Sequence, residues 1–262
     1  MKVVILCGGM GTRLREETEY RPKPLVKIGP QPILWHIMKI YSEQGFNDFV
    51  LCLGYKGEMI KEFFVNFDWM SQDFTLDLKT GKRVPLGQNP PMEDWKITFA
   101  DTGIQTNTGG RIKRIQNLIE DDVFMCTYGD GLSNVDINAL LKFHQNSGKI
   151  ATLTAIHPMS PFGVIEVEGG LAKTFKEKPQ LDGLINGGFF VFSRGIFDYL
   201  EDNSVLEEEP LRRLAYDKQL SVYEHKGFWQ CMDTFKDVER LNAMYERGER
   251  PWMFWENKKG ER

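Results

Sequence analysis

A short apolar run near the start of the chain leads directly into a loop rich in glycine. Val3–Cys7 has the aliphatic, β-branched composition of a buried strand, and Gly8, Gly9 and Gly11 follow it at once. Glycines this close together allow backbone N–H groups to approach an anion, because no Cβ stands in the way. The loop is therefore a candidate phosphate site, and the alternative is a tight turn that only ends the strand.

The spacing of these glycines matches neither of the two best-known phosphate-binding loops. A dinucleotide-binding G-x-G-x-x-G motif that starts at Gly9 fits Gly11 but places Leu14 where its last glycine belongs. A Walker A loop that starts at Gly8 requires a glycine where the chain has Arg13. These mismatches argue against a dinucleotide-dependent oxidoreductase, which remains an alternative that an NADH titration would test.

The first half of the sequence alternates strand-like with helix-like segments. We expect strands at Val3–Cys7, Asp48–Leu53, Lys96–Ala100 and Val123–Thr127, and helices at Ile33–Gln44, Glu58–Phe67, Gly110–Ile119 and Val135–Gln145. Strands that alternate with helices favour a mostly parallel sheet covered by helices on both faces. The predicted fold class is therefore α/β, with a Rossmann-like central sheet.

The second half is richer in β-structure. We expect strands at Ala151–Ile156, Gly163–Val167, Ala172–Lys176 and Gly187–Phe192, and helices at Arg194–Leu200, Glu208–Tyr216 and Asp237–Arg247. The short links between these strands predict an antiparallel β region added to the parallel core, and so a mixed sheet. We interpret residues 68–94 as a long loop or a hairpin lid, and residues 256–262 as a solvated tail.

The overall composition excludes several classes of protein. A net charge of −4, from 33 basic and 37 acidic residues, is too balanced for a duplex nucleic-acid partner. No apolar run approaches the ~20 residues of a membrane span, and the N-terminal run is too short for a signal peptide. No Cys-x-x-Cys pair occurs among Cys7, Cys52, Cys126 and Cys231, which favours free thiols in a reducing cytoplasm over zinc binding.

A lysine between two prolines follows the glycine loop. Pro22 and Pro24 each fix their own φ, and Pro24 disfavours a helical conformation at Lys23, so we expect Lys23 on an extended strap. A point charge held close to a phosphate loop suits a phosphate ligand. The alternative is a solvated surface lysine.

The glycine loop and the lysine strap together resemble the signature of a known family. The chain reads G-G-M-G-T-R-L from Gly8 and R-P-K-P-L-V from Arg21, as sugar-1-phosphate nucleotidyltransferases do. Residues 14–18, 32–38 and 54–57 are similar to the cytidylyltransferase branch of that family, which uses CTP and glucose 1-phosphate. The similarity runs from Lys2 to about Trp255 and is weakest over residues 68–94.

Two aspartates are candidate metal ligands. Asp130 lies between glycines after a predicted strand, at the end where open α/β sheets bind ligands, and Asp233 precedes a predicted helix. The alternatives are a turn aspartate and a helix cap. Transfer between two phosphates needs charge neutralisation, most often by Mg²⁺ on carboxylates, and the resemblance implies that these two positions hold it. The four histidines lack metal-ligand spacing, and His36 is interpreted as a helix or nucleotide-pocket residue.

The resemblance also implies a nucleotide pocket and a set of catalytic residues. The implied nucleotide-binding residues are Leu6, Gly8, Gly9, Gly11, Thr12, Arg13, Lys23, Thr108, Arg111 and Gly129, and the implied catalytic residues are Arg13, Lys23, Asp130 and Asp233. An exposed loop with a surface arginine is the alternative for the segment from Thr108 to Arg111. The preference for cytosine over uracil rests on the branch resemblance alone, because the two bases differ at a single exocyclic position.

A sugar-phosphate site is implied in the second half. Lys178 repeats the lysine-before-proline arrangement, and the resemblance places Glu177, Lys178, Asn186 and Gly187 against the sugar 1-phosphate. Asn186 offers both a donor and an acceptor. For Glu177 and Lys178 the alternative is an exposed charged strand. Tyr128 and Trp229 are equally compatible with the pocket and with the core.

The sequence therefore predicts an enzyme that transfers a cytidylyl group from CTP to a hexose 1-phosphate. The attacking phosphate is already an anion at neutral pH, so no general base is required and catalysis depends on positioning and charge stabilisation. The resemblance implies CDP-glucose as product, a role in deoxysugar, O-antigen or other cell-surface (lipopolysaccharide) biosynthesis, and a cytoplasmic homo-oligomer. UTP or dTTP, another sugar or polyol phosphate, and a non-catalytic nucleotide-sensing subunit remain alternatives.

The positions of the two aspartates also bear on domain organisation. Asp130 and Asp233 are 103 positions apart and must meet in one site. We therefore expect one domain over residues 1–262, with residues 1–130 mainly for the nucleotide, 131–235 mainly for the sugar, and 236–262 as C-terminal helix and tail. This leaves no room for the left-handed β-helix appended in some longer relatives.

Overall fold

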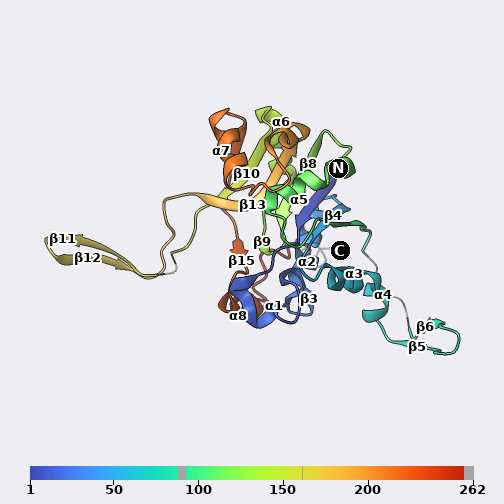
Figure 1. The fold of residues 1–262 in the computed structure, drawn as a ribbon. Helices are drawn as coiled ribbons and strands as arrows, with labels where there is room; N and C mark the ends of the chain where they lie inside the picture. The colour runs from blue at the N-terminus through green and yellow to red at the C-terminus, as the bar shows by residue number, and fades with distance from the viewer. Residues whose placement is uncertain (88–92, 161, 257–262) are drawn as a thin grey trace.

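The first strand of the chain lies inside a seven-stranded sheet. The computed structural model describes residues 1–87, 93–160 and 162–256, and its sheet has the order β14-β10-β13-β8-β1-β4-β7 (Figure 1). Its strands are β1 (Lys2–Leu6), β4 (Asp48–Leu53), β7 (Lys96–Asp101), β8 (Val123–Tyr128), β10 (Ala151–Ile156), β13 (Ile185–Ser193) and β14 (Leu220–His225). The N-terminal and C-terminal halves of the sequence therefore contribute strands to the same sheet.

The sheet is mixed and mostly parallel, as the sequence predicted. β1 pairs in parallel with β4 and β8, β4 with β7, and β10 with β14, whereas β13 is antiparallel to both β8 and β10. Parallel strands end at the same edge of a sheet, so the residues that follow β1 and β8 emerge side by side. This edge receives the glycine loop and Asp130.

Helices cover both faces of the sheet and enclose two cores. Val3 and Ile5 face a core formed with α2 (Ile33–Ser42), α6 (Ile137–Ser147) and α8 (Phe235–Glu246). Val4 and Leu6 face a second core formed with α5 (Thr108–Arg114), η4 (Arg194–Tyr199) and α7 (Glu209–Tyr216). Alternate residues of a strand point to opposite faces, so one continuous apolar run supplies both cores. None of the described helices is long and apolar enough to span a membrane.

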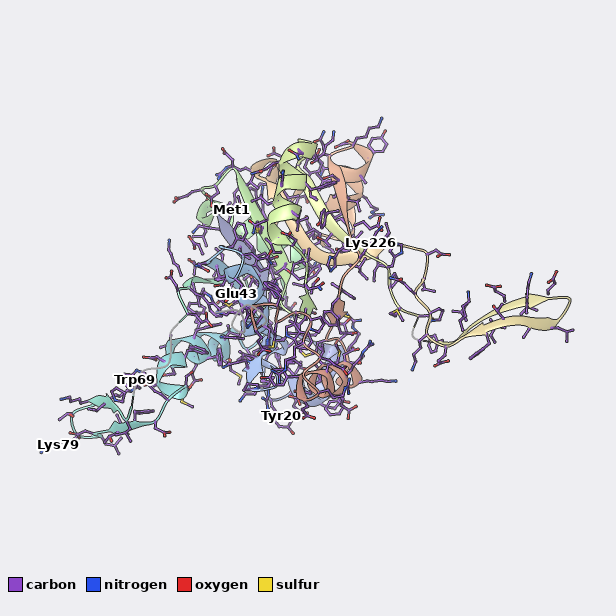
Figure 2. All side chains as sticks on the ribbon, turned by 180° about the vertical axis from the view of Figure 1, so that it is seen from behind. Met1, Tyr20, Glu43, Trp69, Lys79 and Lys226 are labelled. Atoms are coloured by element: carbon purple, nitrogen blue, oxygen red, sulfur yellow. The ribbon has the colours of Figure 1, made fainter. Side chains whose placement is uncertain are left out.

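Two β-hairpin arms extend away from the body. β5 (Phe74–Leu76) pairs with β6 (Arg83–Pro85), and β11 (Val164–Glu168) pairs with β12 (Leu171–Lys176). Figures 1 and 2 show both arms projecting from the body, with Lys79 at the tip of the first. Their exposed apolar side chains are Leu76, Leu78, Val84 and Leu86 on the first arm and Ile165, Val167, Leu171 and Phe175 on the second.

Several local expectations need correction. The strap at Lys23 is not extended: Lys23 begins a 3₁₀ turn, η2 (Lys23–Leu25), because the preceding Pro22 already takes the extended conformation and a proline is tolerated in a first turn. We expected a long loop or a hairpin lid at residues 68–94, and the structure has a hairpin there. This hairpin points away from the body, so it is not a lid over it. Residues 88–92, and 257–262 of the expected tail, lie outside the described residues.

The expected helices also differ in their details. The helix expected at Glu58–Phe67 is divided into α3 (Gly57–Val65) and α4 (Phe67–Met70), and that expected at Gly110–Ile119 into α5 and η3 (Gln116–Leu118). The segment expected as a helix at Arg194–Leu200 is the 3₁₀ helix η4. The remaining elements are η1 (Thr12–Leu14), α1 (Arg15–Thr18), and the short pairs β2 (Lys27–Ile28) with β3 (Gln31–Pro32) and β9 (Gly131–Ser133) with β15 (Trp229–Cys231).

Candidate active site

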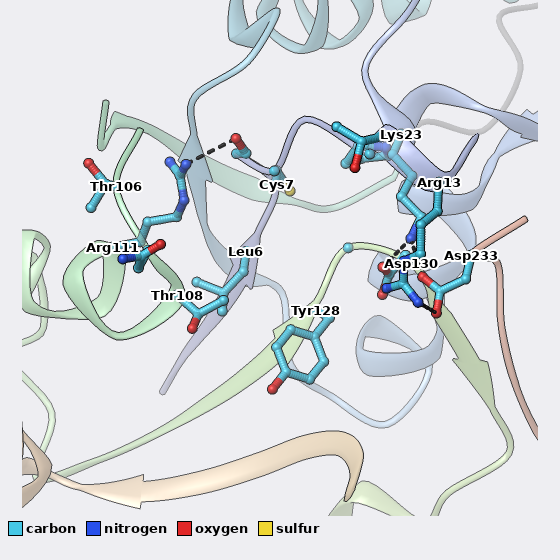
Figure 3. A pocket seen from close by; sticks show the side chains of 17 residues that line it. Leu6, Cys7, Arg13, Lys23, Thr106, Thr108, Arg111, Tyr128, Asp130 and Asp233 are labelled. Carbon is cyan, nitrogen blue, oxygen red and sulfur yellow. Dashed lines mark hydrogen bonds and ion pairs between the residues drawn. The ribbon is translucent and has the colours of Figure 1, made fainter. Parts of the chain in front are cut away.

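A cleft of about 340 Å³ opens at the carboxyl ends of β1 and β8 (Figure 3). Its lining residues are Leu6, Cys7, Gly8, Gly9, Gly11, Thr12, Arg13, Lys23, Pro24, Thr106, Asn107, Thr108, Arg111, Tyr128, Gly129, Asp130 and Asp233. All ten residues expected at the nucleotide, and both expected metal ligands, are among them. The structure thus gathers these residues in one cavity, although their contacts with a ligand remain a prediction.

The glycine loop depends on the absence of side chains at two positions. Gly11 has a φ of +63°, a left-handed conformation that favours glycine, and a Cβ there would lie 2.7 Å from Thr18 Cγ2. A Cβ on Gly8 would lie 2.0 Å from Arg111 Nη1. Gly9, in contrast, has open space where a Cβ would be. The conformation of the loop is therefore set by packing at Gly8 and by the backbone at Gly11.

Arg111 holds this loop from beneath. Its guanidinium donates hydrogen bonds to the carbonyl oxygens of Gly8, Leu53, Gly103 and Ile104 and to Thr102 Oγ1, over 2.8 to 3.2 Å. Burial lowers the pKa of Arg111 from its ordinary value. The residue is buried and not on the surface, and most of its donors are already committed to the protein. In this structure Arg111 braces the loop, the neighbouring strand end and the segment that leads to α5.

Four charged residues meet at the opposite end of the cleft (Figure 3). Lys23 Nζ lies 2.6 Å from Asp130 Oδ2 and 2.7 Å from Asp233 Oδ1, and Arg13 Nη1 lies 3.2 Å from Asp233 Oδ2. Burial alone would lower the pKa of Lys23, but the two carboxylates raise it above its usual value. Burial alone would raise the pKa of Asp233, but Lys23 and Arg13 lower it. Lys23 and Asp233 therefore both carry charge at neutral pH.

The two aspartates lie close together because the short strands β9 and β15 pair with each other. Asp130 precedes β9 and Asp233 follows β15, and the antiparallel pairing aligns Gly131 with Cys231. The Met232 backbone N–H also donates to the Asp130 carbonyl oxygen at 2.9 Å. Asp130 and Asp233 are more than a hundred positions apart in the sequence. The three paired positions of β9 and β15, with one further backbone hydrogen bond, hold them near each other.

The chemistry of this pair fits a magnesium ion. No group of three or more potential metal-ligating side chains occurs among the residues that the structure describes. Mg²⁺, however, is commonly bound through one or two carboxylates, with substrate phosphates and waters as its other ligands. Asp130 and Asp233 already enclose a cationic group, Lys23 Nζ, which shows that their oxygens converge on one position. These two carboxylates are therefore a suitable donor set for Mg²⁺ that arrives with a nucleotide.

A polar network lies along the rim between the two ends of the cleft. Thr108 Oγ1 donates to Glu207 Oε2 at 2.7 Å, and Tyr128 OH donates to Glu207 Oε1. Asn186 Nδ2 donates to Tyr128 OH at 3.3 Å. The network thus joins a residue expected at the nucleotide, Thr108, with one expected at the sugar, Asn186. Glu207 had no sequence signal, because it lies in an ordinary acidic run before a proline.

The residues expected at the sugar phosphate do not line the cleft. Glu177 and Lys178 follow β12 at the base of an arm, and both are exposed. Lys178 Nζ lies 3.6 Å from Glu177 Oε1. Lys178 has a φ of +47°, which is unusual for a residue with a side chain. Gly187 contributes its carbonyl oxygen to a 2.7 Å hydrogen bond from Trp229 Nε1. Within this single chain, Glu177 and Lys178 are not brought to the site.

His36 and three of the four cysteines do not line the cleft, whereas Cys7 does. His36 is buried in α2 away from the cleft lining, with Nε2 2.9 Å from the Ile28 carbonyl oxygen. Cys7, Cys52 and Cys126 are buried free thiols, as expected. Cys231 is only partly buried, and its Sγ lies 3.7 Å from Asp233 Oδ2. Burial and the nearby Asp233 raise the pKa of Cys231 to about 12, so the thiol stays protonated.

Comparison with known proteins gives concordant results. Residues 2–247 match the nucleotidyl transferase family model. A probable glucose-1-phosphate cytidylyltransferase of Bacillus subtilis is 51% identical over 257 residues, which cover 97% of this chain and 100% of that protein. A glucose-1-phosphate cytidylyltransferase of Salmonella typhi is 46% identical over 259 residues, with coverage of 98% and 100%.

Solved structures show the same fold at lower identity. HddC from Yersinia pseudotuberculosis superposes with a TM-score of 0.67 at 24% identity, over 93% of this chain and 99% of that one. A UDP-glucose pyrophosphorylase complexed with UDP-glucose gives a TM-score of 0.68 at 17% identity, over 94% and 98%. These likenesses extend over nearly the whole length of each chain.

Proposed function

The chain belongs to the nucleotidyl transferase family, and from that premise we propose that it transfers the cytidylyl group of CTP to α-D-glucose 1-phosphate. The family membership confirms the resemblance inferred from the sequence. The substrates follow from relatives that are 46% and 51% identical over nearly the full length of both chains. The structural observation that carries the proposal is the group of Arg13, Lys23, Asp130 and Asp233 beside the glycine loop.

The reaction exchanges one phosphoanhydride bond for another. A phosphate oxygen of glucose 1-phosphate attacks the α-phosphorus of CTP, a new P–O bond forms, and the bond between the α-phosphorus and the bridging oxygen breaks. The bond electrons leave with pyrophosphate, and the other product is CDP-glucose. No proton has to be removed from the nucleophile, so the protein contributes orientation and neutralisation of charge.

The residues of the cleft suit these tasks. The backbone N–H groups between Gly8 and Gly11, together with Arg13, bind the triphosphate, and Lys23 stabilises charge near the α-phosphate. Asp130 and Asp233 would hold Mg²⁺, which would supply Lewis-acid neutralisation of the phosphate oxygens. The cytosine occupies the other end of the cleft, against Leu6 and Thr108, with Arg111 as support for the loop.

In this proposal a second copy of the chain completes the site for the sugar phosphate. Asn186 is hydrogen-bonded to Tyr128, which lines the cleft, and Gly187 follows it in β13. Glu177 and Lys178, in contrast, lie at the base of an exposed arm. The arm carries Val167, Leu171 and Phe175, each with at least 64% of the residue exposed, and such grouped apolar surface is typical of an interaction site. We propose a homo-oligomer in which this arm packs on a second copy and presents Glu177 and Lys178 there.

The test of the assignment uses pyrophosphate release as its measurement. The protein, mixed with CTP, Mg²⁺ and glucose 1-phosphate, is expected to release pyrophosphate faster than with UTP or dTTP, or with other sugar or polyol phosphates. Asp130→Ala and Asp233→Ala are expected to lose turnover while they remain folded by circular dichroism. Normal turnover in either variant would contradict the metal assignment, and no turnover of the unmodified protein with any pair would contradict the transferase.

The cellular setting is part of the same proposal. CTP and hexose phosphates are charged cytoplasmic metabolites, so the enzyme acts in the cytoplasm. CDP-glucose is an activated sugar, so its product is consumed by enzymes that modify or transfer sugars, such as those of deoxysugar and cell-surface polysaccharide synthesis.

A further inference from the structure

Glu207 lies outside every motif of the cleft, yet its carboxylate accepts hydrogen bonds from two hydroxyls of the rim. One comes from Thr108 at the start of α5 and the other from Tyr128 at the end of β8. A carboxylate has acceptor positions only, so the protons of both hydroxyls must point toward Glu207. The side chain of Glu207 therefore determines the direction of two hydroxyl groups that line the cleft.

This direction fixes what the hydroxyls offer to a ligand. A hydroxyl has one donor and two acceptor lone pairs. The donor of Thr108 is committed to Glu207, and one of its lone pairs accepts from the Leu206 backbone N–H at 2.9 Å. One lone pair is left. Tyr128 likewise donates to Glu207 and accepts from Asn186, so both hydroxyls can meet a ligand only as acceptors.

We propose that Glu207 is a positioning residue that sets the preference for cytosine, by holding Thr108 as a fixed acceptor for the exocyclic amino group. This inference rests on the function proposed above. Cytosine carries an amino donor where uracil carries a carbonyl acceptor. A lone pair of Thr108 Oγ1 that faces the exocyclic group attracts the amino group of cytosine. It repels the carbonyl oxygen of uracil and leaves that oxygen without a hydrogen-bond partner. Thr108 cannot turn its proton toward uracil without breaking its bond to Glu207.

The test compares kcat/KM for CTP and for UTP. Glu207→Gln keeps the size of the side chain but replaces one acceptor oxygen with an NH₂ donor, which frees a hydroxyl to turn. We expect the ratio of CTP to UTP to fall roughly tenfold or more. Thr108→Val, which removes the hydroxyl and keeps the branched shape, is expected to lower the ratio similarly. Glu207→Gln added to Thr108→Val should then change the ratio no further.

Glu208→Gln is the matched control, because it makes the same charge change one residue later, and the Glu208 side chain makes no capping bond to α7. It is expected to leave the ratio unchanged. A Glu207→Gln variant that keeps the original ratio, or one that shifts it equally with and without the Thr108 hydroxyl, would overturn the inference. An unmodified protein with no activity toward CTP would instead contradict the proposed function, so the two failures are distinguishable.

A second inference comes from an independent observation, the position of Lys23. Its ammonium group contacts Asp130 at 2.6 Å and Asp233 at 2.7 Å, so it occupies the position on which both carboxylates converge. The ammonium and a divalent cation thus compete for the same two oxygens. We infer that Lys23 is a resident counterion, which keeps divalent cations from binding firmly until the triphosphate draws its charge away.

Binding of Mn²⁺ without nucleotide tests this inference, with free Mn²⁺ measured by electron paramagnetic resonance. Lys23→Met leaves the two carboxylates without their counterion, and we expect it to bind Mn²⁺ roughly tenfold more tightly than the unmodified protein. Lys27→Met, an exposed lysine of the neighbouring β2, is the control and should not change the affinity. Adding Asp130→Asn to Lys23→Met should abolish the gain. Equal affinity of Lys23→Met and the unmodified protein would overturn the inference.

Discussion

Single residues at the floor of the cleft show how packing determines the shape of the phosphate loop. Gly8 passes so close to Arg111 that its carbonyl oxygen accepts a 3.0 Å hydrogen bond, and the guanidinium fills the space where a side chain would stand. The same guanidinium binds four further acceptors. Gly8 and the buried Arg111 are therefore coupled, because a side chain at position 8 would occupy the place of the guanidinium.

Gly8→Ala and Gly9→Ala form a matched pair. A Cβ at Gly8 overlaps the guanidinium of Arg111, so we expect the free energy of unfolding to fall by about 2 kcal/mol or more. Gly9 has open space and an ordinary φ, so Gly9→Ala should stay within about 0.5 kcal/mol. Urea denaturation measures both. Equal stabilities of the two variants would show that the close approach of Gly8 to Arg111 is not rigid.

His36 predicts a dependence of stability on pH. Burial lowers the pKa of His36 from 6.5 to about 4, and both ring nitrogens have partners suited to the neutral form: the Ile28 carbonyl accepts from Nε2, and Trp252 Nε1 donates to Nδ1 at 3.4 Å. Between these pKa values the unfolded chain binds more protons, so stability is level above the unfolded value and falls as the pH decreases through the window.

We expect this residue alone to contribute a loss of about 2 kcal/mol between about pH 7.5 and pH 5. Denaturant unfolding at the two pH values measures the loss. His36→Gln has no titrating ring, so its stability should change less over the same interval. An identical pH dependence of the variant and the unmodified protein would contradict the assignment.

At this scale the sequence predicted the residues of the cleft well and their partners poorly. The family resemblance implied Arg13, Lys23, Asp130 and Asp233, because the motifs around these residues are distinctive. Glu207 was not predicted as a site residue, because its contacts with Thr108 and Tyr128 form only when the chain folds. Glu177 and Lys178 were expected near the cleft, but sequence spacing gives no information on the direction in which a hairpin leaves the body.

Among the elements, the start of α8 has the most direct relation to the site. Thr234 and Asp237 form a capping box, in which each side chain accepts from the other's backbone N–H. The Asp237 carboxylate also accepts from the Asp233 backbone N–H at 3.1 Å. The cap of the helix therefore fixes the backbone of a proposed metal ligand.

Thr234→Ala is expected to lower stability by about 1 kcal/mol, since it removes a helix cap, and also to lower kcat through the displaced Asp233. Asp136→Ala removes the N-cap of α6, where the side chain accepts from the Ala139 backbone N–H at 2.8 Å, and α6 lies outside the cleft lining. It should cost similar stability with normal kcat. Paired melting and turnover measurements decide, and an unchanged kcat in Thr234→Ala would contradict the link.

Most strands, including the exposed pair β11 and β12, were predicted within one or two residues, whereas β14 and the shortest strands were missed. β4 and β10 match their expected ranges, because a strand buried on both faces has an unmistakable composition. β14 alternates partly buried and exposed residues at the sheet edge, and β9 and β15 have three residues each. The pairing that aligns the two aspartates was therefore not visible in the sequence.

For the molecule as a whole, the end of the chain returns to close the N-terminal half. Trp252 has no exposed surface, packs against Phe228 with 5.5 Å between ring centroids, and reaches His36 in α2. α8 adds hydrogen bonds from Asn242, whose side chain accepts from the Gly29 backbone N–H and donates to the Lys27 carbonyl oxygen. The C-terminal segment is therefore part of the main core and not an appendage.

Trp252→Ala is expected to lower the free energy of unfolding by about 3 to 5 kcal/mol, because it leaves a large cavity in that core. Trp69→Ala removes the same atoms from the base of the β5–β6 arm, where the ring is only partly buried, and should cost less than half as much. Guanidinium denaturation compares the two. A smaller loss at Trp252 than at Trp69 would show that the end of the chain is loosely attached.

The contacts of Lys23 have a consequence for how the protein is made. Its two carboxylate partners follow it by 107 and 210 positions. During translation the chain acquires Asp130 well after Lys23, and Asp233 a further 103 positions later. A product that ends before Asp233 lacks one carboxylate of this charged centre, so under the proposed mechanism it is expected to have no turnover.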